Sequence, residues 1–218
     1  MFDEYTSNDQ VYRPQSMRLS GGSIDMSVIR AFIAINLAPS IQQRLDEVMR
    51  AFKQRLDNDC IRWVPANNIH LTLKFLGDVS IANLELLTNL LQAEVVSHRS
   101  FEISVGGAGA FPTIHRPRVL WVGVEAPPEL TAIQSGVEGS MARLGYPPEE
   151  RPFSPHLTIG RVGRNINPQE YRNISTAIES VKVGFLGAMR VNAINLYKSD
   201  LQPSGAVYTR IFTAPLKA

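Results

Sequence analysis

Two short stretches of the sequence repeat nearly the same pattern, a histidine followed two residues later by a threonine. Residues 70–73 read HLTL and residues 156–159 read HLTI. Side chains alternate between the two faces of a β-strand, so each histidine shares a face with its threonine, while the leucines and the isoleucine turn to the core. If the two parts of the molecule pack symmetrically with these polar faces opposed, two imidazoles and two hydroxyls converge on one cleft.

Such a cleft could perform acid–base chemistry on a phosphate. Histidine gives or takes a proton near neutral pH, and a pair of histidines can hold one group in each state. A threonine hydroxyl donates a hydrogen bond to an oxyanion without any change of charge. An acid, a base and two oxyanion donors suit in-line displacement at phosphorus, above all cleavage or formation of a phosphodiester. We therefore predict His70 and His156 as catalytic residues and Thr72 and Thr158 as phosphate-binding residues.

Other interpretations of these residues fit the sequence less well. One such pattern alone would be explained by a half-buried strand histidine hydrogen-bonded to a neighbour, but a matched pair favours a functional site. The sequence has no HxH or HExxH pattern, a single cysteine (Cys60) and no carboxylate beside either motif histidine, so we expect no metal and no cofactor. It also lacks GxSxG and P-loop sequences. His98 and His115 lie outside the repeated pattern and are predicted as surface residues.

Periodicity divides residues 28–218 into two similar halves. The first half contains a strand at 28–36, a helix at 41–56 begun by a capping box of Ser40 and Gln43, the histidine strand at 70–76, a helix at 83–96, and a strand at 101–105 before a turn at Gly106 and Gly107. The second half contains a strand at 118–125, a helix at 130–144 capped by Gly145, the histidine strand at 156–162, a helix begun by Asn167 and Pro168, and strands at 183–186, 190–197 and 206–213.

The order strand, helix, histidine strand, helix, strand therefore occurs twice, which indicates an internal duplication. We predict an α+β fold of two pseudo-symmetric lobes around a central cleft. Each lobe would be a mostly antiparallel sheet with helices on its outer side.

Composition excludes several classes of protein. Of the 218 residues 44% are hydrophobic and 19% are charged, which supports a core, and 22 basic against 20 acidic residues give a net charge of +2. That charge is too small for a polybasic binder but allows an anionic ligand at one local site. No apolar run reaches the ~18 residues of a membrane span, and we expect a cytoplasmic, monomeric protein without membrane association. Residues 1–27 are predicted as a poorly ordered extension before a single domain at 28–218.

The two motifs and their surroundings resemble the two-histidine (2H) phosphoesterase superfamily, which is defined by a pair of H-x-[ST]-x motifs. The context is similar to its RNA 2′,3′-cyclic phosphodiesterase branch, also called 2′-5′ RNA ligase-like. The similar segments are RAFIAI at 30–35, WVPANN at 63–68, KFLG at 74–77, PRVLW at 117–121 and FSP at 153–155. The resemblance extends from residue 28 to the C-terminus, and the N-terminal extension has no counterpart in it.

The resemblance implies metal-independent opening of a 2′,3′-cyclic phosphate to a 2′-phosphomonoester. By analogy His70 is the acid and His156 the base, although the near-symmetry of the motifs leaves that assignment open. The implied partners are RNA ends or nucleotides that carry a cyclic phosphate. Three alternatives stay open: action on 2′-5′ linkages, with ligation as the reverse reaction, action on small cyclic nucleotides, and a non-catalytic RNA-binding module.

Arg161 matches a position that the resemblance associates with phosphate contact. Strict alternation along the strand sends Arg161 away from the histidine face, so this role requires Gly160 to permit a bulge or the strand to end there. The alternative is a solvent-facing arginine at a strand end. Lys74 is expected either on the histidine face or at its solvent-exposed rim. Core packing is the favoured interpretation for the aromatic side chains near the motifs, Phe75, Trp121 and Phe153. The alternative for Phe153, together with Arg151, is contact with a ribose or base.

Overall fold

The computed structural model describes residues 27–56, 60–125, 127–203 and 205–218. Residues 1–26, which make up almost all of the predicted extension, lie outside the described residues, so that expectation stays a prediction. None of the helices in the described part of the chain is both long enough and apolar enough to span a lipid bilayer.

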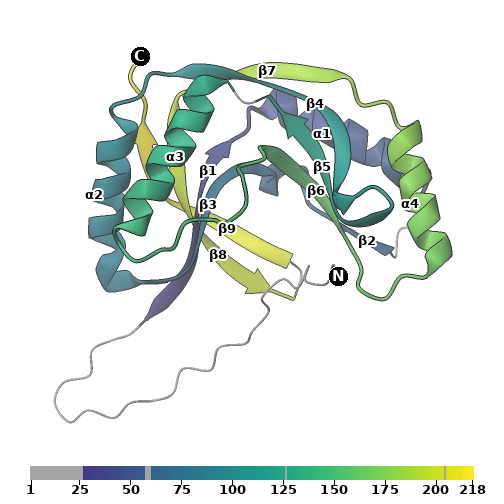
Figure 1. Cartoon of the computed structure of the whole chain (residues 1–218), viewed down its shortest axis with the longest axis horizontal. Coiled ribbons are helices and arrows are strands. Elements are labelled where there is room, and N and C mark those ends of the chain that lie inside the picture. The colour runs from purple at the N-terminus through teal and green to yellow at the C-terminus, as the bar shows by residue number, and fades with distance from the viewer. Residues whose placement is uncertain (1–26, 57–59, 126, 204) are drawn as a thin grey trace, which may run out of the picture.

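Within these residues the structure combines helices with one large sheet (Figure 1). The α-helices are α1 (Pro39–Lys53), α2 (Leu84–Val95), α3 (Pro128–Ala142) and α4 (Pro168–Ser180), and the short 3-10 helices are η2 (Ala66–Asn68) and η3 (Ile81–Asn83). The strands are β1 (Val28–Asn36), β2 (Ile61–Trp63), β3 (His70–Ser80), β4 (Phe101–Thr113), β5 (Arg116–Val124), β6 (His156–Val162), β7 (Phe185–Val191), β8 (Ala193–Gln202) and β9 (Gly205–Pro215).

The strands run in the order β7-β4-β5-β6-β3-β1-β8-β9, with β2 also paired to β6, and the pairings between these described strands are all antiparallel. The central strands β3 and β6 pair only at Leu71 and Leu157, so the sheet divides there into two lobes. We call β3, β1, β8 and β9 the first lobe, and β6, β5, β4 and β7 the second lobe. The predicted α+β fold with two antiparallel lobes is confirmed.

The lobes do not correspond to the two halves of the chain. Strand β4 belongs to the first half but pairs with β5 in the second lobe, and β8 belongs to the second half but pairs with β1 in the first lobe. The helices cross in the same way, because α1 packs on β7 and α3 packs on β3. Each half of the chain therefore contributes strands and helices to both lobes. The repeated order of elements in the sequence does not reveal this exchange.

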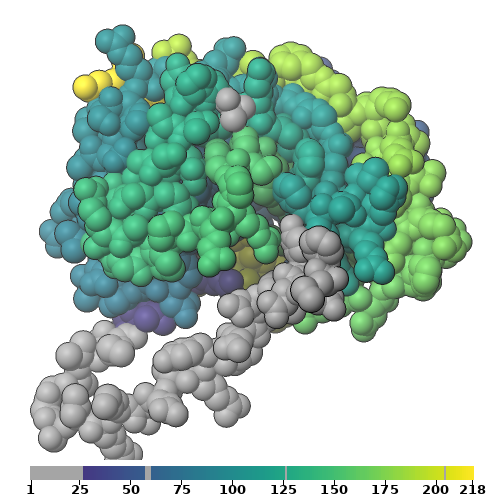
Figure 2. Space-filling model, in the orientation of Figure 1, coloured from purple at the N-terminus to yellow at the C-terminus, as the bar shows by residue number. Residues whose placement is uncertain are grey.

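The helices cover the outer side of the sheet. Helices α2 and α3 pack on each other and on the first lobe, while α4 packs on β5 and β4 of the second. In the orientation of Figure 1, α2 and α3 form one flank of the surface and α4 the other (Figure 2). Helix α1 buries one face against the sheet because its apolar residues recur at helical spacing: Ile41, Leu45, Val48, Met49 and Phe52.

Two local predictions are wrong for identifiable reasons. Helix α1 begins at Pro39 after an N-cap at Ala38 that makes no side-chain hydrogen bond, so Ser40 lies inside the first turn and forms no capping box. Proline suits the first helical position because its fixed φ matches the helix and its missing N–H would have no partner there. A capping box does occur in α4, where Asn167 accepts from the backbone of Glu170 and the Glu170 side chain accepts in return.

The predicted turn at Gly106 and Gly107 does not form, because β4 continues through both residues to Thr113. Gly107 has a φ of 69° and lies where the register with β5 shifts by one residue. A Cβ on Gly106 would lie 2.7 Å from the carbonyl oxygen of Gly184, so this glycine permits the close approach of neighbouring backbone. Paired glycines inside a strand thus mark a bulge and a close contact rather than the end of the strand.

Candidate active site

The two histidine motifs lie side by side at the joint between the lobes. Leu71 of β3 and Leu157 of β6 are antiparallel partners and are fully buried. Continuing this register by one residue in each direction places each motif histidine opposite the threonine of the other motif. The histidines and threonines are all partly buried, which fits a shared face away from the core. The structure therefore brings the four predicted side chains to one place.

A bulge in β6 turns Arg161 toward the same face. Relative to β5, the register of β6 shifts between Thr158 and Gly160, so that Ile159 has no partner. The extra residue reverses the alternation, and Arg161 returns to the side of the motif histidine as an exposed side chain. Its positive charge lowers the pKa of both motif histidines, which indicates that the guanidinium lies near both. The bulge that a phosphate contact by Arg161 requires is present.

Strand β3 has a bulge at the equivalent position, and it overturns two predictions. Relative to β1, the register shifts at Leu73, so Lys74 turns to the core side. Lys74 is buried, with Nζ 2.6 Å from Oε2 of Glu138 and 2.8 Å from the carbonyl oxygen of Pro147. It lies neither on the histidine face nor at an exposed rim. Phe75 is 65% exposed rather than part of the core, because the same bulge moves it to the cleft side.

The prediction of core packing for Trp121 is also wrong. Its neighbours Leu120 and Val122 enter the core, so Trp121 lies on the opposite face of β5, as the cross-strand partner of Thr158. Its indole ring rests against Gly109, where any Cβ would collide with it. The indole Nε1 is buried and has no hydrogen-bond partner among the described residues. Phe153, in contrast, packs against the hydrophobic core as predicted.

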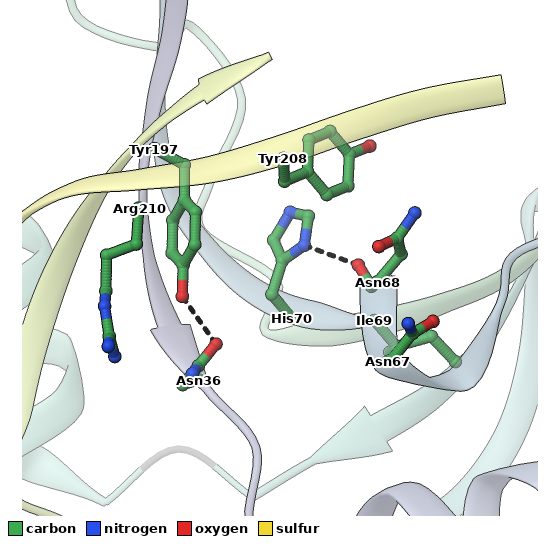
Figure 3. A pocket seen from close by; sticks show the side chains of 8 residues that line it. All are labelled: Asn36, Asn67, Asn68, Ile69, His70, Tyr197, Tyr208 and Arg210. Carbon is green, nitrogen blue, oxygen red and sulfur yellow. Dashed lines mark hydrogen bonds between the residues drawn. The ribbon is translucent and has the colours of Figure 1, made fainter. Parts of the chain in front are cut away.

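His70 lies among aromatic rings, of which Figure 3 shows Tyr197 and Tyr208. It stacks on Phe32 with 4.5 Å between ring centroids, and the ring of Tyr208 stands at 86° to the imidazole with 5.2 Å between centroids. Its Nδ1 lies 2.8 Å from the carbonyl oxygen of Asn68. Burial lowers the pKa of His70, the hydrogen bond to Asn68 opposes that shift, and the charge of Arg161 adds to it.

His156 has the same backbone contact but fewer ring contacts. Its Nδ1 lies 2.7 Å from the carbonyl oxygen of Ser154, and Phe111 meets the imidazole edge to face at 4.9 Å. Burial lowers the pKa of His156 as well, with the hydrogen bond to Ser154 raising it and Arg161 lowering it further.

These contacts fix the tautomer of both imidazoles. A carbonyl oxygen only accepts hydrogen bonds, so each Nδ1 carries a hydrogen and each neutral ring has its lone pair on Nε2. The lowered pKa values favour the neutral form of both rings in the free protein. A phosphate between them would supply the negative charge that favours protonation of one ring. The site can then hold one Nε2 as a base and the other as an acid.

Several polar residues beside His70 were not found from the sequence. Asn36 is the cross-strand partner of His70, and its Oδ1 accepts a hydrogen bond of 2.6 Å from the hydroxyl of Tyr197. Tyr208 and Arg210 join them from β9. A polar residue that ends an apolar strand, as Asn36 does after residues 28–35, is the one signal in the sequence that could have pointed here. The residues of β8 and β9 come from far along the chain and carry no motif.

The described residues contain no group of three histidine, cysteine, aspartate or glutamate side chains placed to hold a metal ion. An antiparallel sheet split into two lobes, with two H-x-T-x strands side by side at the joint, defines a phosphoesterase of the two-histidine class. Residues 35–121 and 122–208 each match the family described as LigT like Phosphoesterase, and the chain belongs to this family. The two matches also confirm the internal duplication.

Relatives of known name are similar over most of the chain. The RNA 2′,3′-cyclic phosphodiesterase of Methanothermobacter thermautotrophicus is 33% identical over 181 residues, which cover 83% of this chain and 95% of the relative. The protein of the same name from Aquifex aeolicus is 34% identical over 190 residues, covering 84% of this chain and 95% of the relative. The chain is therefore similar to these phosphodiesterases along nearly their whole length, and its family is a family of enzymes.

Solved structures share the fold. The protein TT0787 of Thermus thermophilus superposes with a TM-score of 0.73 at 24% identity, covering 87% of this chain and 99% of that one. Escherichia coli LigT in complex with 3′-AMP superposes with a TM-score of 0.68 at 25% identity, covering 88% of this chain and all of that one.

Proposed function

We propose that this chain hydrolyses the 2′,3′-cyclic phosphate end of an RNA to a 2′-phosphomonoester without a metal ion. The catalytic residues would be His70 and His156, and the catalytic domain residues 28–218. The relatives named above are RNA 2′,3′-cyclic phosphodiesterases, and the substrate class is taken from them. The mechanism rests on the geometry of this chain.

The reaction needs one proton removed and one delivered. Nε2 of His156 takes a proton from a water molecule whose oxygen attacks phosphorus. The bond between phosphorus and O3′ breaks on the opposite side, and Nε2 of His70 gives its proton to the departing O3′. The products are a 2′-phosphomonoester and a free 3′-hydroxyl, and the two histidines have exchanged protonation states. Proton exchange with solvent restores the starting state.

Neutral and cationic donors would hold the charge that develops on the phosphate. The hydroxyls of Thr72 and Thr158 donate to the non-bridging oxygens, one from each side of the sheet joint. Arg161 adds a positive charge on the same face and can form a charge-assisted hydrogen bond to one of these oxygens. These donors act most strongly on the transition state, in which the oxygens carry additional charge.

One observation carries the proposal: the two motifs meet on adjacent antiparallel strands with each Nδ1 held by a carbonyl oxygen two residues earlier. That arrangement leaves both Nε2 atoms available for proton transfer. A protein that only binds RNA has no need for two equally oriented imidazoles.

The test is hydrolysis of a short RNA ending in a 2′,3′-cyclic phosphate, in EDTA, with the position of the product phosphate resolved. The parent protein, His70→Ala and His156→Ala are compared side by side, with the surface variant His115→Ala as a matched control. We expect a 2′-phosphate from the parent and from His115→Ala, and none from the other two variants at the same enzyme concentration.

Other outcomes contradict the proposal. A need for an added divalent cation would refute the metal-independent mechanism. No turnover by the parent, combined with RNA binding that survives both alanine variants, would show a binding module. Turnover of only 2′-5′-linked or small cyclic nucleotides would keep the site and replace the substrate.

We also propose that the protein acts as a cytoplasmic monomer. Cys60 is the one cysteine of the sequence and is buried, so the chain offers no exposed thiol for a disulfide between two copies. Sedimentation equilibrium of the purified chain should give the mass of one copy, 24.2 kDa, and a mass of two copies would refute the monomer.

A further inference from the structure

A cavity of about 270 Å³ opens beside His70 in the first lobe. Its walls come from the end of β1, from η2, from the start of β3, and from β8 and β9 (Figure 3). These segments lie far apart in the sequence, and they meet because β8 pairs with β1 and β9 pairs with β8. The proposed mechanism uses His70 and the Asn68 carbonyl oxygen that holds its Nδ1, and the other lining side chains have no assigned task.

The lining favours an anionic ligand. Among the described residues that form it there are three asparagines, two tyrosines and one arginine, and none carries a carboxylate. The Tyr197 hydroxyl donates to Oδ1 of Asn36, so the Nδ2 group of Asn36 keeps its hydrogens for another acceptor. Asn68 is already engaged, because its Nδ2 donates to the carbonyl oxygen of Ala206 and thereby ties η2 to β9.

Arg210 supplies the charge of the cavity. It is the cross-strand partner of Tyr197, and its side chain extends beside that ring (Figure 3). The side chain is exposed and forms no ion pair among the described residues. A guanidinium with unused donors next to open amide groups is the usual partner of a phosphate group.

The proposed reaction gives the direction in which the substrate extends. His70 protonates O3′, so the ribose that carries the cyclic phosphate lies on the His70 side of the cleft. The rest of an RNA chain is attached to the 5′ carbon of that ribose and must leave the cleft from this side. The cavity opens beside His70, where the preceding nucleotide would begin.

We propose that this cavity binds the phosphodiester that joins the terminal nucleotide to the preceding one, with Arg210 as its cation and Asn36 as a hydrogen-bond donor. The inference rests on the proposed function, and it narrows the substrate to an oligonucleotide instead of a mononucleotide. Arg210 is then a residue for specificity, since it contacts a part of the substrate that does not react.

The first experiment measures kcat/KM for a trinucleotide and for a mononucleotide, both ending in a 2′,3′-cyclic phosphate. The parent should prefer the trinucleotide, and Arg210→Gln should lower the trinucleotide-to-mononucleotide ratio about tenfold, since a charge-assisted hydrogen bond is lost. Loss of one phosphate contact should also reduce the slope of log kcat/KM against log salt by about 0.7 for the trinucleotide. Arg172→Gln on α4 removes the same charge from a surface outside the cavity and should leave the ratio unchanged.

A second experiment removes the charge from the substrate. The substrate is a trinucleotide with a neutral methylphosphonate at the linkage before the terminal nucleotide. Compared with the ordinary trinucleotide, its kcat/KM should be about tenfold lower with the parent enzyme and almost unchanged with Arg210→Gln. If kcat/KM falls equally with both enzymes, the contact between Arg210 and this linkage is refuted. The effects of removing two groups that contact each other are not additive, so equal losses show that the two groups do not interact.

The outcomes separate the two proposals. A parent that cleaves neither substrate refutes the proposed function. A parent that cleaves both substrates equally well, or a ratio that Arg210→Gln leaves unchanged, refutes the role of the cavity alone.

Discussion

His70 and His156 begin equivalent strands in the two lobes and hold their Nδ1 atoms in the same way, yet their surroundings differ. Phe32 stacks on His70 and Tyr208 meets it edge-on, while Phe111 alone makes a ring contact with His156 among the described residues. The difference shows that equivalent strands place two imidazoles with the same Nδ1 contact in different surroundings, and burial in those surroundings lowers the pKa of each.

The positions after each motif make the same point. The bulge follows the third residue of each strand, so Lys74 is equivalent to Gly160 and Phe75 to Arg161. One lobe therefore places an exposed aromatic ring on the cleft face where the other places a guanidinium. The backbones of the two motif strands are thus equivalent, whereas the side chains at equivalent positions differ.

The largest expected effect is loss of either motif histidine. His70→Ala and His156→Ala should each lower kcat/KM about 10³-fold, within the usual range for general acid–base catalysis. Because both act in one reaction, the double variant should be no more than about tenfold worse than either single variant. Steady-state kinetics on a cyclic-phosphate RNA gives kcat/KM for the three variants. A loss in the double variant equal to the product of the two single losses would show that the histidines act independently.

Substitutions at the equivalent positions Lys74 and Gly160 should lower the free energy of unfolding by different amounts. Lys74→Met breaks a buried ion pair and leaves Glu138 without its cation, which should cost about 3 kcal/mol. Gly160→Ala should cost about 1–2 kcal/mol, since its Cβ would lie 2.9 Å from Cγ2 of Ile61. Urea denaturation gives both values. Replacing Lys74 and Glu138 together by methionines should recover most of the loss, and no recovery would contradict the ion-pair explanation.

Arg161→Gln should lower kcat/KM about tenfold by removing one charge-assisted hydrogen bond. It should also move both limbs of the pH profile to higher pH, because the positive charge of Arg161 lowers the pKa of each histidine and its removal makes protonation easier. Phe75→Leu at the equivalent position should leave the limbs in place. An unmoved profile for Arg161→Gln would place the guanidinium away from the histidines.

The smallest expected effects are shifts in the pKa of one motif histidine at a time. Tyr208→Leu should raise the pKa of His70 and leave that of His156 unchanged, since Tyr208 makes a ring contact with His70 and, among the described residues, none with His156. Phe111→Leu should do the reverse. NMR titration of the imidazole resonances, assigned with His→Gln variants, follows each ring separately. If both rings respond to both variants, their surroundings are not independent.

The sequence predicted the paired motifs, their common face and the antiparallel α+β fold, because these follow from period-two alternation and from repetition. It failed where alternation was interrupted. The bulges at Leu73 and Ile159 reversed the faces of the residues that follow, which made the expectations for Lys74 and Phe75 wrong. A bulge costs one unpaired residue and leaves little trace in composition, except where a glycine such as Gly160 accompanies it.

Contacts between distant segments were also beyond the sequence. The exchange of β4 and β8 between the lobes, and the meeting of Asn36 with Tyr197 and Arg210, depend on which strand edges pair. Local propensity carries no information on that choice, since every strand edge has the same backbone donors and acceptors.

The most direct test of different roles for the two histidines uses a leaving group that needs no proton. A nucleoside 4-nitrophenyl phosphodiester releases nitrophenolate without an acid, so only the base is required. With this substrate His70→Ala should come within about tenfold of the parent, while His156→Ala should remain about 10³-fold slower. Equal losses for both variants, or recovery of His156→Ala instead, would contradict the assignment of His70 as the acid and His156 as the base.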